Sequence, residues 1–289
     1  MNIIYINFIS QTHGGVPCLD DWSRCCNINV MTDVVLVDRD GDIATVTLNR
    51  PEKLNAFTKT MWGRLGSVMD ELSEDASLRC IILRGAGDKA FCPGNDISEF
   101  ADERSNSVQA QAYGAFMDKS IQSIRACPVP KVAMVKGVCV GGGLEVAGLC
   151  DIRICGESSR FGAPISKLGL VMGYQELGAL SDLVGAQGAY EILLEGRILD
   201  ASEALQKGIV SRVVADDEVE AEALATAGRI ADGAPLVHRW HRKFLDRMTD
   251  PTPPSEEEIK EAYACYDTAD FKTGYKAFLE KKKPDFKGR

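Results

Sequence analysis

The chain has 289 residues, which is enough for one large domain or a domain with an appendage. Hydrophobic residues make up 45 % and charged residues 26 %, as in soluble globular proteins, so disordered, collagenous and coiled-coil classes are excluded. The net charge of −9 argues against a nucleic-acid partner. No membrane partner is expected either, because the most apolar stretch, 132–150, is interrupted by Lys136 and Glu145.

Residues 1–30 differ from the rest of the chain, because they are polar and glycine-containing with no periodic pattern after the apolar run 3–9. We expect a disordered or loosely docked N-terminal extension. No Lys or Arg precedes the apolar run, which argues against a secretory signal. The ten cysteines form no C-x-x-C pair, and none of the three histidines lies at zinc-binding spacing from a cysteine. Free thiols, a reducing cytoplasmic location and no metal site are therefore expected.

The first organised segment predicts a β-hairpin, with strands over 34–37 and 43–48 joined by the turn Asp40-Gly41. Strands and helices then alternate, which is typical of α/β architecture. The further strands are expected at 80–83, 132–135, 152–155 and 209–214, and the helices between them at 58–72, 108–124 and 144–149. Beyond about residue 177 helices dominate, including 219–231, 237–248, 256–266 and 271–282.

Two glycine-containing turns are candidate binding sites. Residues 84–90 match a G-x-G-x-x-A dinucleotide pattern, but a proline-glycine turn follows where a helix is required, so that site is not expected. After Pro93, the residues Gly94-Asn95-Asp96 offer three consecutive backbone N–H donors. Gly141-Gly142-Gly143 lies between a strand and a short helix, where free N–H groups suit a developing oxyanion. A close helix crossing would explain these glycines equally well.

Glu145 favours the functional interpretation of the second turn. This glutamate lies within a largely apolar element, and glutamates are rarely buried there without a task. The sequence contains no G-x-S-x-G motif, so a serine nucleophile of the α/β-hydrolase kind is not expected. His238 and His241 belong to an amphipathic helix, so packing or surface roles are expected for them.

From about residue 34 to its end, the chain resembles the enoyl-CoA hydratase/isomerase (crotonase) superfamily in five ordered segments. They are 48–56, 91–97, 141–145 with 150–152, 160–164 and 277–283. The resemblance implies an α/β fold, in which a spiral of ββα units over 31–215 precedes a helical C-terminal region, 216–289. It further implies that this region forms a homotrimer or a dimer of trimers. The implied substrate is an acyl-CoA thioester, with no cofactor beyond that coenzyme A.

The same resemblance implies roles for individual residues. The backbone N–H groups of Asn95 and Gly142 would hold a thioester enolate, and Glu145 would position water or move the proton. Coenzyme A would lie against Lys53, Leu54, Ala56, Asn95, Asp96 and Ile97, and it would contact Phe278 and Lys281, commonly from a neighbouring subunit. The stretch 272–289, with seven cationic and two anionic side chains, would meet its phosphates, unless it is simply a solvated basic tail.

One departure from the family pattern bears on the reaction. Typical hydratases have a second glutamate just after Phe-Gly-x-Pro, where this chain has Ile165, which cannot move protons. Glu176 could supply a substitute carboxylate, although a helix-start residue favoured by the helix dipole is the simpler interpretation.

Enoyl-CoA hydration is the leading expectation for the reaction. One alternative is isomerisation, which needs only one carboxylate. Another is decarboxylation or C–C cleavage, because these reactions pass through the same enolate. A non-catalytic scaffold or RNA-binding member is an alternative of a different class, which the acidic charge and Glu145 disfavour.

Overall fold

The structure, a computed structural model, describes residues 33–289. The expected extension over 1–30 lies outside the described residues. Within residues 33–289, no helix has both the length and the apolar character that crossing a membrane requires.

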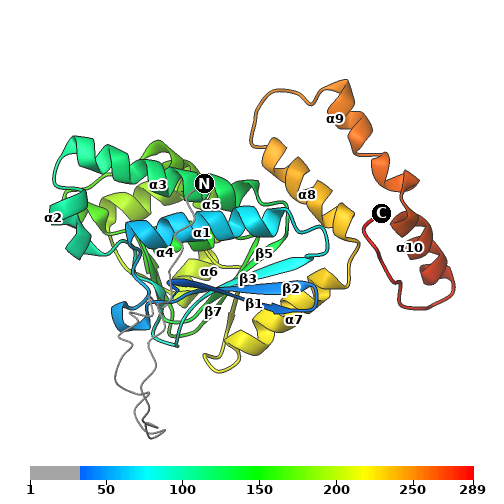
Figure 1. The fold of residues 1–289 in the computed structure, drawn as a ribbon, viewed down its shortest axis with the longest axis horizontal. Helices are drawn as coiled ribbons and strands as arrows, with labels where there is room; N and C mark the ends of the chain where they lie inside the picture. Colours follow the sequence, from blue (N-terminus) through cyan, green and yellow to red (C-terminus); the bar gives the residue numbers. More distant parts are fainter. Residues whose placement is uncertain (1–32) are drawn as a thin grey trace, which may run out of the picture. The chain divides into compact units, whose positions relative to one another are not determined.

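The strands form two sheets (Figure 1). The larger sheet has the order β1 (Val35–Asp40), β2 (Ile43–Leu48), β3 (Cys80–Gly85), β5 (Lys131–Val135), β7 (Ile152–Gly156) and β10 (Arg212–Val214). The smaller sheet has the order β4 (Ala90–Cys92), β6 (Val138–Val140), β8 (Arg160–Gly162) and β9 (Leu199–Asp200). β1 and β2 form the expected antiparallel hairpin, and the later neighbours in the larger sheet are parallel. The fold repeats a ββα unit, in which the first strand joins the larger sheet, the second strand joins the smaller sheet, and a helix follows. The strand pairs of these units are β3–β4, β5–β6 and β7–β8.

Helices cover both faces of the larger sheet, as Figure 1 shows. Alternate residues of a strand point to opposite faces, so each parallel strand serves two cores. Ile81 and Leu83 of β3 belong to the main core with α1 (Lys59–Ser73) and α3 (Ser107–Ala126). Ile82 belongs to the second core, against α7 (Val219–Ala231). The cysteines of the described residues are free, as expected, and all except Cys265 are buried.

The sequence located the helices α1, α3, α7, α8 (Pro235–Arg247) and α10 (Ala269–Leu279) within a few residues but missed the 22-residue α5 (Tyr174–Glu195) and several short elements. The elements it did not name are α2 (Phe100–Glu103), α5 with its kink at Gly185, α6 (Ala201–Gln206), the strands β4, β6, β8 and β9, and the 3₁₀ turns Pro51–Lys53, Ile97–Glu99 and Ile165–Leu168. The expected helix over 256–266 is wrong in its second half. There α9 (Glu256–Glu261) gives way to a 3₁₀ turn over Ala264–Asp267.

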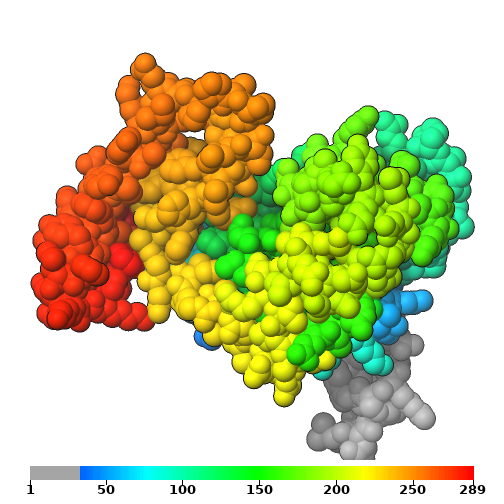
Figure 2. Space-filling model, turned by 180° about the vertical axis from the view of Figure 1, so that it is seen from behind, coloured from blue at the N-terminus to red at the C-terminus, as the bar shows by residue number. Residues whose placement is uncertain are grey.

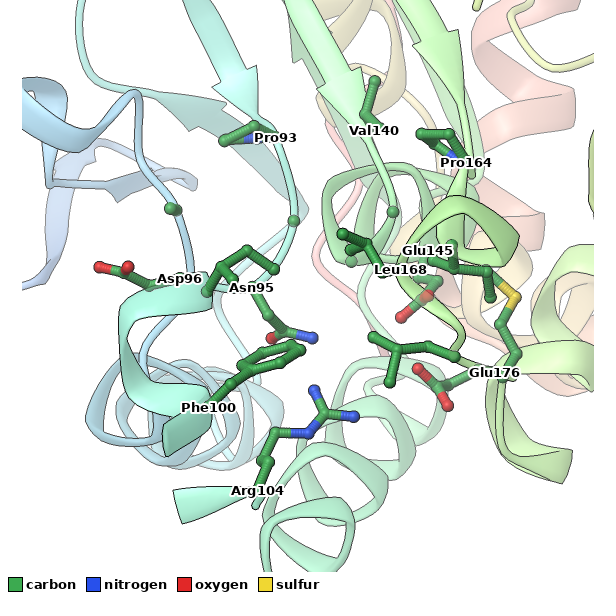
Figure 3. Close-up of a pocket in the computed structure, with 18 of the residues that line it drawn as sticks. Pro93, Asn95, Asp96, Phe100, Arg104, Val140, Glu145, Pro164, Leu168 and Glu176 are labelled. Carbon is green, nitrogen blue, oxygen red and sulfur yellow. The ribbon is translucent and has the colours of Figure 1, made fainter. Parts of the chain in front are cut away.

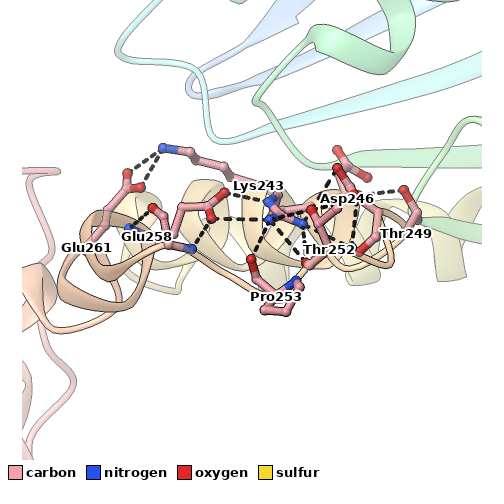
Figure 4. A network of polar contacts seen from close by, with 10 residues as sticks. Lys243, Asp246, Thr249, Thr252, Pro253, Glu258 and Glu261 are labelled. Atoms are coloured by element: carbon pink, nitrogen blue, oxygen red, sulfur yellow. Dashed lines mark hydrogen bonds and ion pairs between the residues drawn. The ribbon is translucent and has the colours of Figure 1, made fainter.

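Three helices, α8 (Pro235–Arg247), α9 and α10 (Ala269–Leu279), form the C-terminal region, and polar contacts join α8 to the body and to α9. Arg242 Nε of α8 donates to Asp151 Oδ1 of the body at 2.7 Å. Between α8 and α9, Lys243 pairs with Glu261 at 2.6 Å and Arg247 pairs with Glu258 (Figure 4).

The C-terminal helical region carries many large apolar side chains that are exposed. They include Leu245, Met248, Ile259, Tyr263, Tyr266, Tyr275, Phe278 and Leu279. In Figure 2 the orange and red surface of this region is not covered by the other described residues on the side in view. The prediction that this region forms a trimer stays a prediction.

Candidate active site

A cavity of about 380 Å³ opens where the strands of the smaller sheet end (Figure 3). Because β4, β6 and β8 are parallel neighbours, the turns that follow them lie side by side. The turn after β4 contributes Gly94 and Asn95, the turn after β6 contributes Gly141 and Gly142, and Pro164 follows β8. Eight of the residues expected in the site line the cavity: Lys53, Ala56, Asn95, Asp96, Ile97, Gly142, Glu145 and Glu176. Leu54, Phe278 and Lys281 do not.

The turn after Pro93 offers one free N–H group, so the expectation of three was wrong. Gly94 N–H donates to Cys92 Sγ at 3.3 Å, and Asp96 N–H donates to Phe57 O at 2.7 Å. The Asp96 bond belongs to a short parallel bridge between Phe57 and Asn95, in which Phe57 N–H also donates to Gly94 O at 2.8 Å. The N–H of Asn95 itself points away from this bridge. Among the described residues, Asn95 N–H has no acceptor.

Gly142 provides the second free N–H group. It is the first residue of α4 (Gly142–Gly148), where a helix has unpaired donors, and no acceptor for it is found among residues 33–289. A Cβ atom on Gly94 would lie 3.4 Å from Gly142 N, so the two turns approach closely. A Cβ atom on Gly143 would lie 2.1 Å from Cys92 O, which only glycine avoids. The glycines therefore allow both the close crossing and the exposure of the donors.

Aromatic packing fixes the Asn95 turn against α1. Trp62 Nε1 of that helix donates to Asn95 Oδ1 at 2.7 Å. The Trp62 ring is fully buried and stacks on Phe57, with ring centroids 4.0 Å apart. Both ends of the short bridge that frees the Asn95 N–H are thus held by one buried aromatic pair.

Two carboxyl groups face each other inside the cavity (Figure 3). Glu145 comes from α4 and is 6 % exposed, whereas Glu176 is the third residue of α5 and accepts a hydrogen bond from Gly173 N–H. No donor among residues 33–289 reaches Glu145 Oε2, and its polar neighbour is the Glu176 carboxyl group. A negative charge on either of two neighbouring carboxyl groups disfavours ionisation of the other.

The environments of the two carboxyl groups disfavour ionisation of Glu145 more than ionisation of Glu176. Burial, followed by the negative charge of Glu176, raises the pKa of Glu145 well above its ordinary value. Burial also raises the pKa of Glu176, but the Gly173 N–H and the positive charge of Arg104 oppose this shift. The pKa is therefore raised further for the carboxyl group on α4 than for the one at the start of α5.

Glu176 accordingly satisfies both interpretations of the sequence, since it caps α5 and also lines the cavity. Ile165 lines the same cavity without a polar group. The sequence missed further lining residues, namely Phe100, Arg104, Leu168, Leu170, Val171 and Met172. They lie in a four-residue helix and in loops, where no periodic signal exists.

Two free N–H groups beside two carboxyl groups with raised pKa values define a site for acid–base chemistry on a substrate that develops an oxyanion. Comparisons with known proteins identify the family. The family model for enoyl-CoA hydratase/isomerase matches residues 38–289, and the chain belongs to this family. The protein is an enzyme of the family.

Curated relatives and solved structures agree with that assignment. The chain is 33% identical over 258 residues to the short-chain-enoyl-CoA hydratase of Clostridium acetobutylicum, covering 88% of this chain and 98% of the relative. It is 31% identical over 254 residues to the crotonyl-CoA hydratase of Syntrophomonas wolfei, covering 87% and 97%. A crystal structure of an enoyl-CoA hydratase/carnithine racemase from Magnetospirillum magneticum matches with a TM-score of 0.88 and 51% identity, covering 89% of this chain and 96% of that one. The predicted crotonase fold is confirmed.

Proposed function

We propose that the protein adds water across the double bond of a 2-enoyl-CoA. The observation that carries this proposal is the pairing of Glu145 and Glu176 beside the free N–H groups of Asn95 and Gly142. The thioester oxygen would accept from both N–H groups as it becomes negative during addition. A preorganised donor of this kind contributes roughly 3 to 4 kcal/mol to the transition state.

The two carboxyl groups would divide the proton transfers. The Glu176 carboxylate takes a proton from water as the water oxygen bonds to the β-carbon. The protonated Glu145 gives its proton to the α-carbon, and the pair is reset by transfer between the two groups. The elevated pKa of Glu145, caused first by burial, supports its role as the acid. A second carboxyl group favours hydration over isomerisation, for which one carboxylate is enough.

Coenzyme A is proposed to lie along Lys53, Leu54, Ala56, Asp96 and Ile97, and no further cofactor is proposed. Phe278 and Lys281 would reach the coenzyme from the neighbouring subunit of a homotrimer or a dimer of trimers. The exposure of Phe278, 82 % in the single chain, supports a role that needs a second molecule.

The test is turnover of crotonyl-CoA by the purified protein, followed as loss of the absorbance of the conjugated enoyl thioester. Formation of 3-hydroxybutyryl-CoA, and its loss in Glu145→Gln, is the expected result. Conversion of a 3-enoyl-CoA to its 2-enoyl isomer without hydration would replace the proposal by the isomerase alternative. If acyl-CoA binds and neither reaction occurs, the proposal is wrong.

A further inference from the structure

Arg104 presents a guanidinium group to the cavity from the end of α2. In Figure 3 its side chain points into the cavity, across from the turns that carry Pro93 and Val140. The guanidinium lies over the ring of Phe100 at 4.7 Å and over the ring of Tyr113 at 5.0 Å. Tyr113 is itself buried and its hydroxyl donates to Glu99 Oε2 at 3.0 Å. The two rings therefore hold the planar group in place, with its N–H edge available.

This guanidinium has no acceptor within the described part of the chain. No ion pair within 4.0 Å and no side-chain hydrogen bond joins Arg104 to residues 33–289. Arg50 contrasts with it, because Arg50 pairs with the cavity-lining Asp96 at 3.0 Å. The five N–H donors of the Arg104 guanidinium therefore have no acceptor among residues 33–289 and are available to a ligand.

The nearby wall of the cavity is apolar, with Leu168, Val171 and Met172 among its residues. A hydrocarbon acyl chain packed into this space would remove water from the guanidinium and give no hydrogen bond in return. Such uncompensated desolvation of a charge is unfavourable. A carboxylate would restore the lost bonds, since the planar fork of arginine matches it with two parallel N–H donors.

We propose that Arg104 selects acyl-CoA thioesters whose acyl chain ends in a carboxylate, so that the substrates are enoyl thioesters of dicarboxylic acids. This inference rests on the proposed function and deepens it by naming the substrate class. The far carboxylate binds the N–H edge of Arg104, while the thioester oxygen is held at Asn95 and Gly142. Arg104 is a specificity residue in this account.

A different role for Arg104 gives different results. If Arg104 only balanced the charge of Glu145 and Glu176, its loss would affect every acyl-CoA by the same factor. It would also shift the pH profile for every substrate alike, because the Arg104 charge lowers the pKa of both carboxyl groups.

The experiment compares binding of glutaryl-CoA and pentanoyl-CoA, which have equal chain length and differ in the terminal carboxylate. Neither has a double bond to hydrate, so calorimetry measures affinity without turnover, and crotonyl-CoA hydration tests the proposed function separately. We expect the wild-type protein to prefer glutaryl-CoA about 10- to 100-fold, as for hydrogen bonds to a charged group. Arg104→Met should abolish the preference. Arg104→Lys, which keeps the charge without the fork, should retain part of it.

The matched control is Arg64→Met on α1, an arginine outside the cavity that pairs with Glu71 at 3.0 Å. It should leave the preference unchanged. Equal affinities of the wild-type protein for the two thioesters would overturn the inference. The same preference in Arg104→Met as in the wild type would overturn it as well, whether or not crotonyl-CoA is hydrated.

Discussion

Replacing Glu176 by glutamine removes the ionised member of the carboxyl pair while keeping the side chain's size. We expect this change to lower the kcat for crotonyl-CoA about 100-fold or more, the usual cost of losing a general base. Glu145→Gln should cost about the same, because the two groups share one proton. The double variant should be at most about tenfold slower than either single variant, since residues that act as a unit are not additive.

The assay combines hydration kinetics with acyl-CoA binding and thermal unfolding, so that loss of chemistry is separated from loss of folding. Glu203→Gln is the matched control. Glu203 is the third residue of α6, and its carboxylate accepts from Asp200 N–H at 3.2 Å, as Glu176 accepts from Gly173 N–H. Glu203 does not line the cavity. The control should lose under about 1 kcal/mol of stability and no turnover. Robust hydration by Glu176→Gln would refute the reasoning.

The pH dependence of stability provides a second measurement on the same variants. Because the pKa of Glu145 is raised by burial, the folded chain keeps a proton that the unfolded chain releases above about pH 4.5. The free energy of unfolding therefore falls as the pH rises from that value, by up to about 1.4 kcal/mol per pH unit, until it reaches the raised pKa. Glu145→Gln should remove this loss and be more stable than the wild type at pH 8. A less stable variant at pH 8, with the wild-type pH slope, would contradict this account.

Three further predictions follow from the cavity and its surroundings. Lys281→Ala should raise the KM for acyl-CoA, more so at low ionic strength, because the proposed partner is a phosphate; an equal defect with acyl-pantetheine substrates would exclude that partner. Gly143→Ala should lower the free energy of unfolding by roughly 1 to 3 kcal/mol or more, and with it the melting temperature, because the added Cβ would lie 2.1 Å from Cys92 O. An unchanged melting temperature would contradict the close contact. Ile165→Glu should lower hydration at neutral pH, because it adds a third carboxyl group beside Glu176; faster hydration would instead show that Glu176 is a helix-start residue only.

Periodicity predicted most of the long elements, but it missed the 22-residue α5, which is kinked at Gly185. The helix over 219–231 matches α7 at both ends, and the larger sheet follows the predicted strands. β4, β6 and β8 have three residues each, too few for an alternating pattern, yet their ends build the site. The spiral of ββα units was predicted only from the family resemblance, because the periodicity of a sequence does not depend on the order of the strands in a sheet.

The site was predictable where one residue type signals its own chemistry. A glutamate in an apolar helix beside three consecutive glycines drew attention to this turn, and Glu145 and Gly142 do line the cavity. Arg104 could not, because a single arginine in a short helix is ordinary and only its placement over two rings makes it distinct. The number of free donors after Pro93 depended on a bridge to Phe57, which is distant in sequence.

The cavity divides into a part built from backbone and a part built from side chains, and this division matters for redesign by laboratory evolution. The N–H groups of Asn95 and Gly142 are set by strand ends and by glycines, because Gly143 has no room for a Cβ atom and Gly94 and Gly141 have positive φ angles. The opposite wall, residues 165–172, is a 3₁₀ turn and a loop outside both sheets. Variant libraries confined to residues 165–172 would change which acyl groups the cavity accepts, while the backbone N–H groups of Asn95 and Gly142 would stay in place. Libraries that include the glycine turns would consist mostly of inactive or unfolded members.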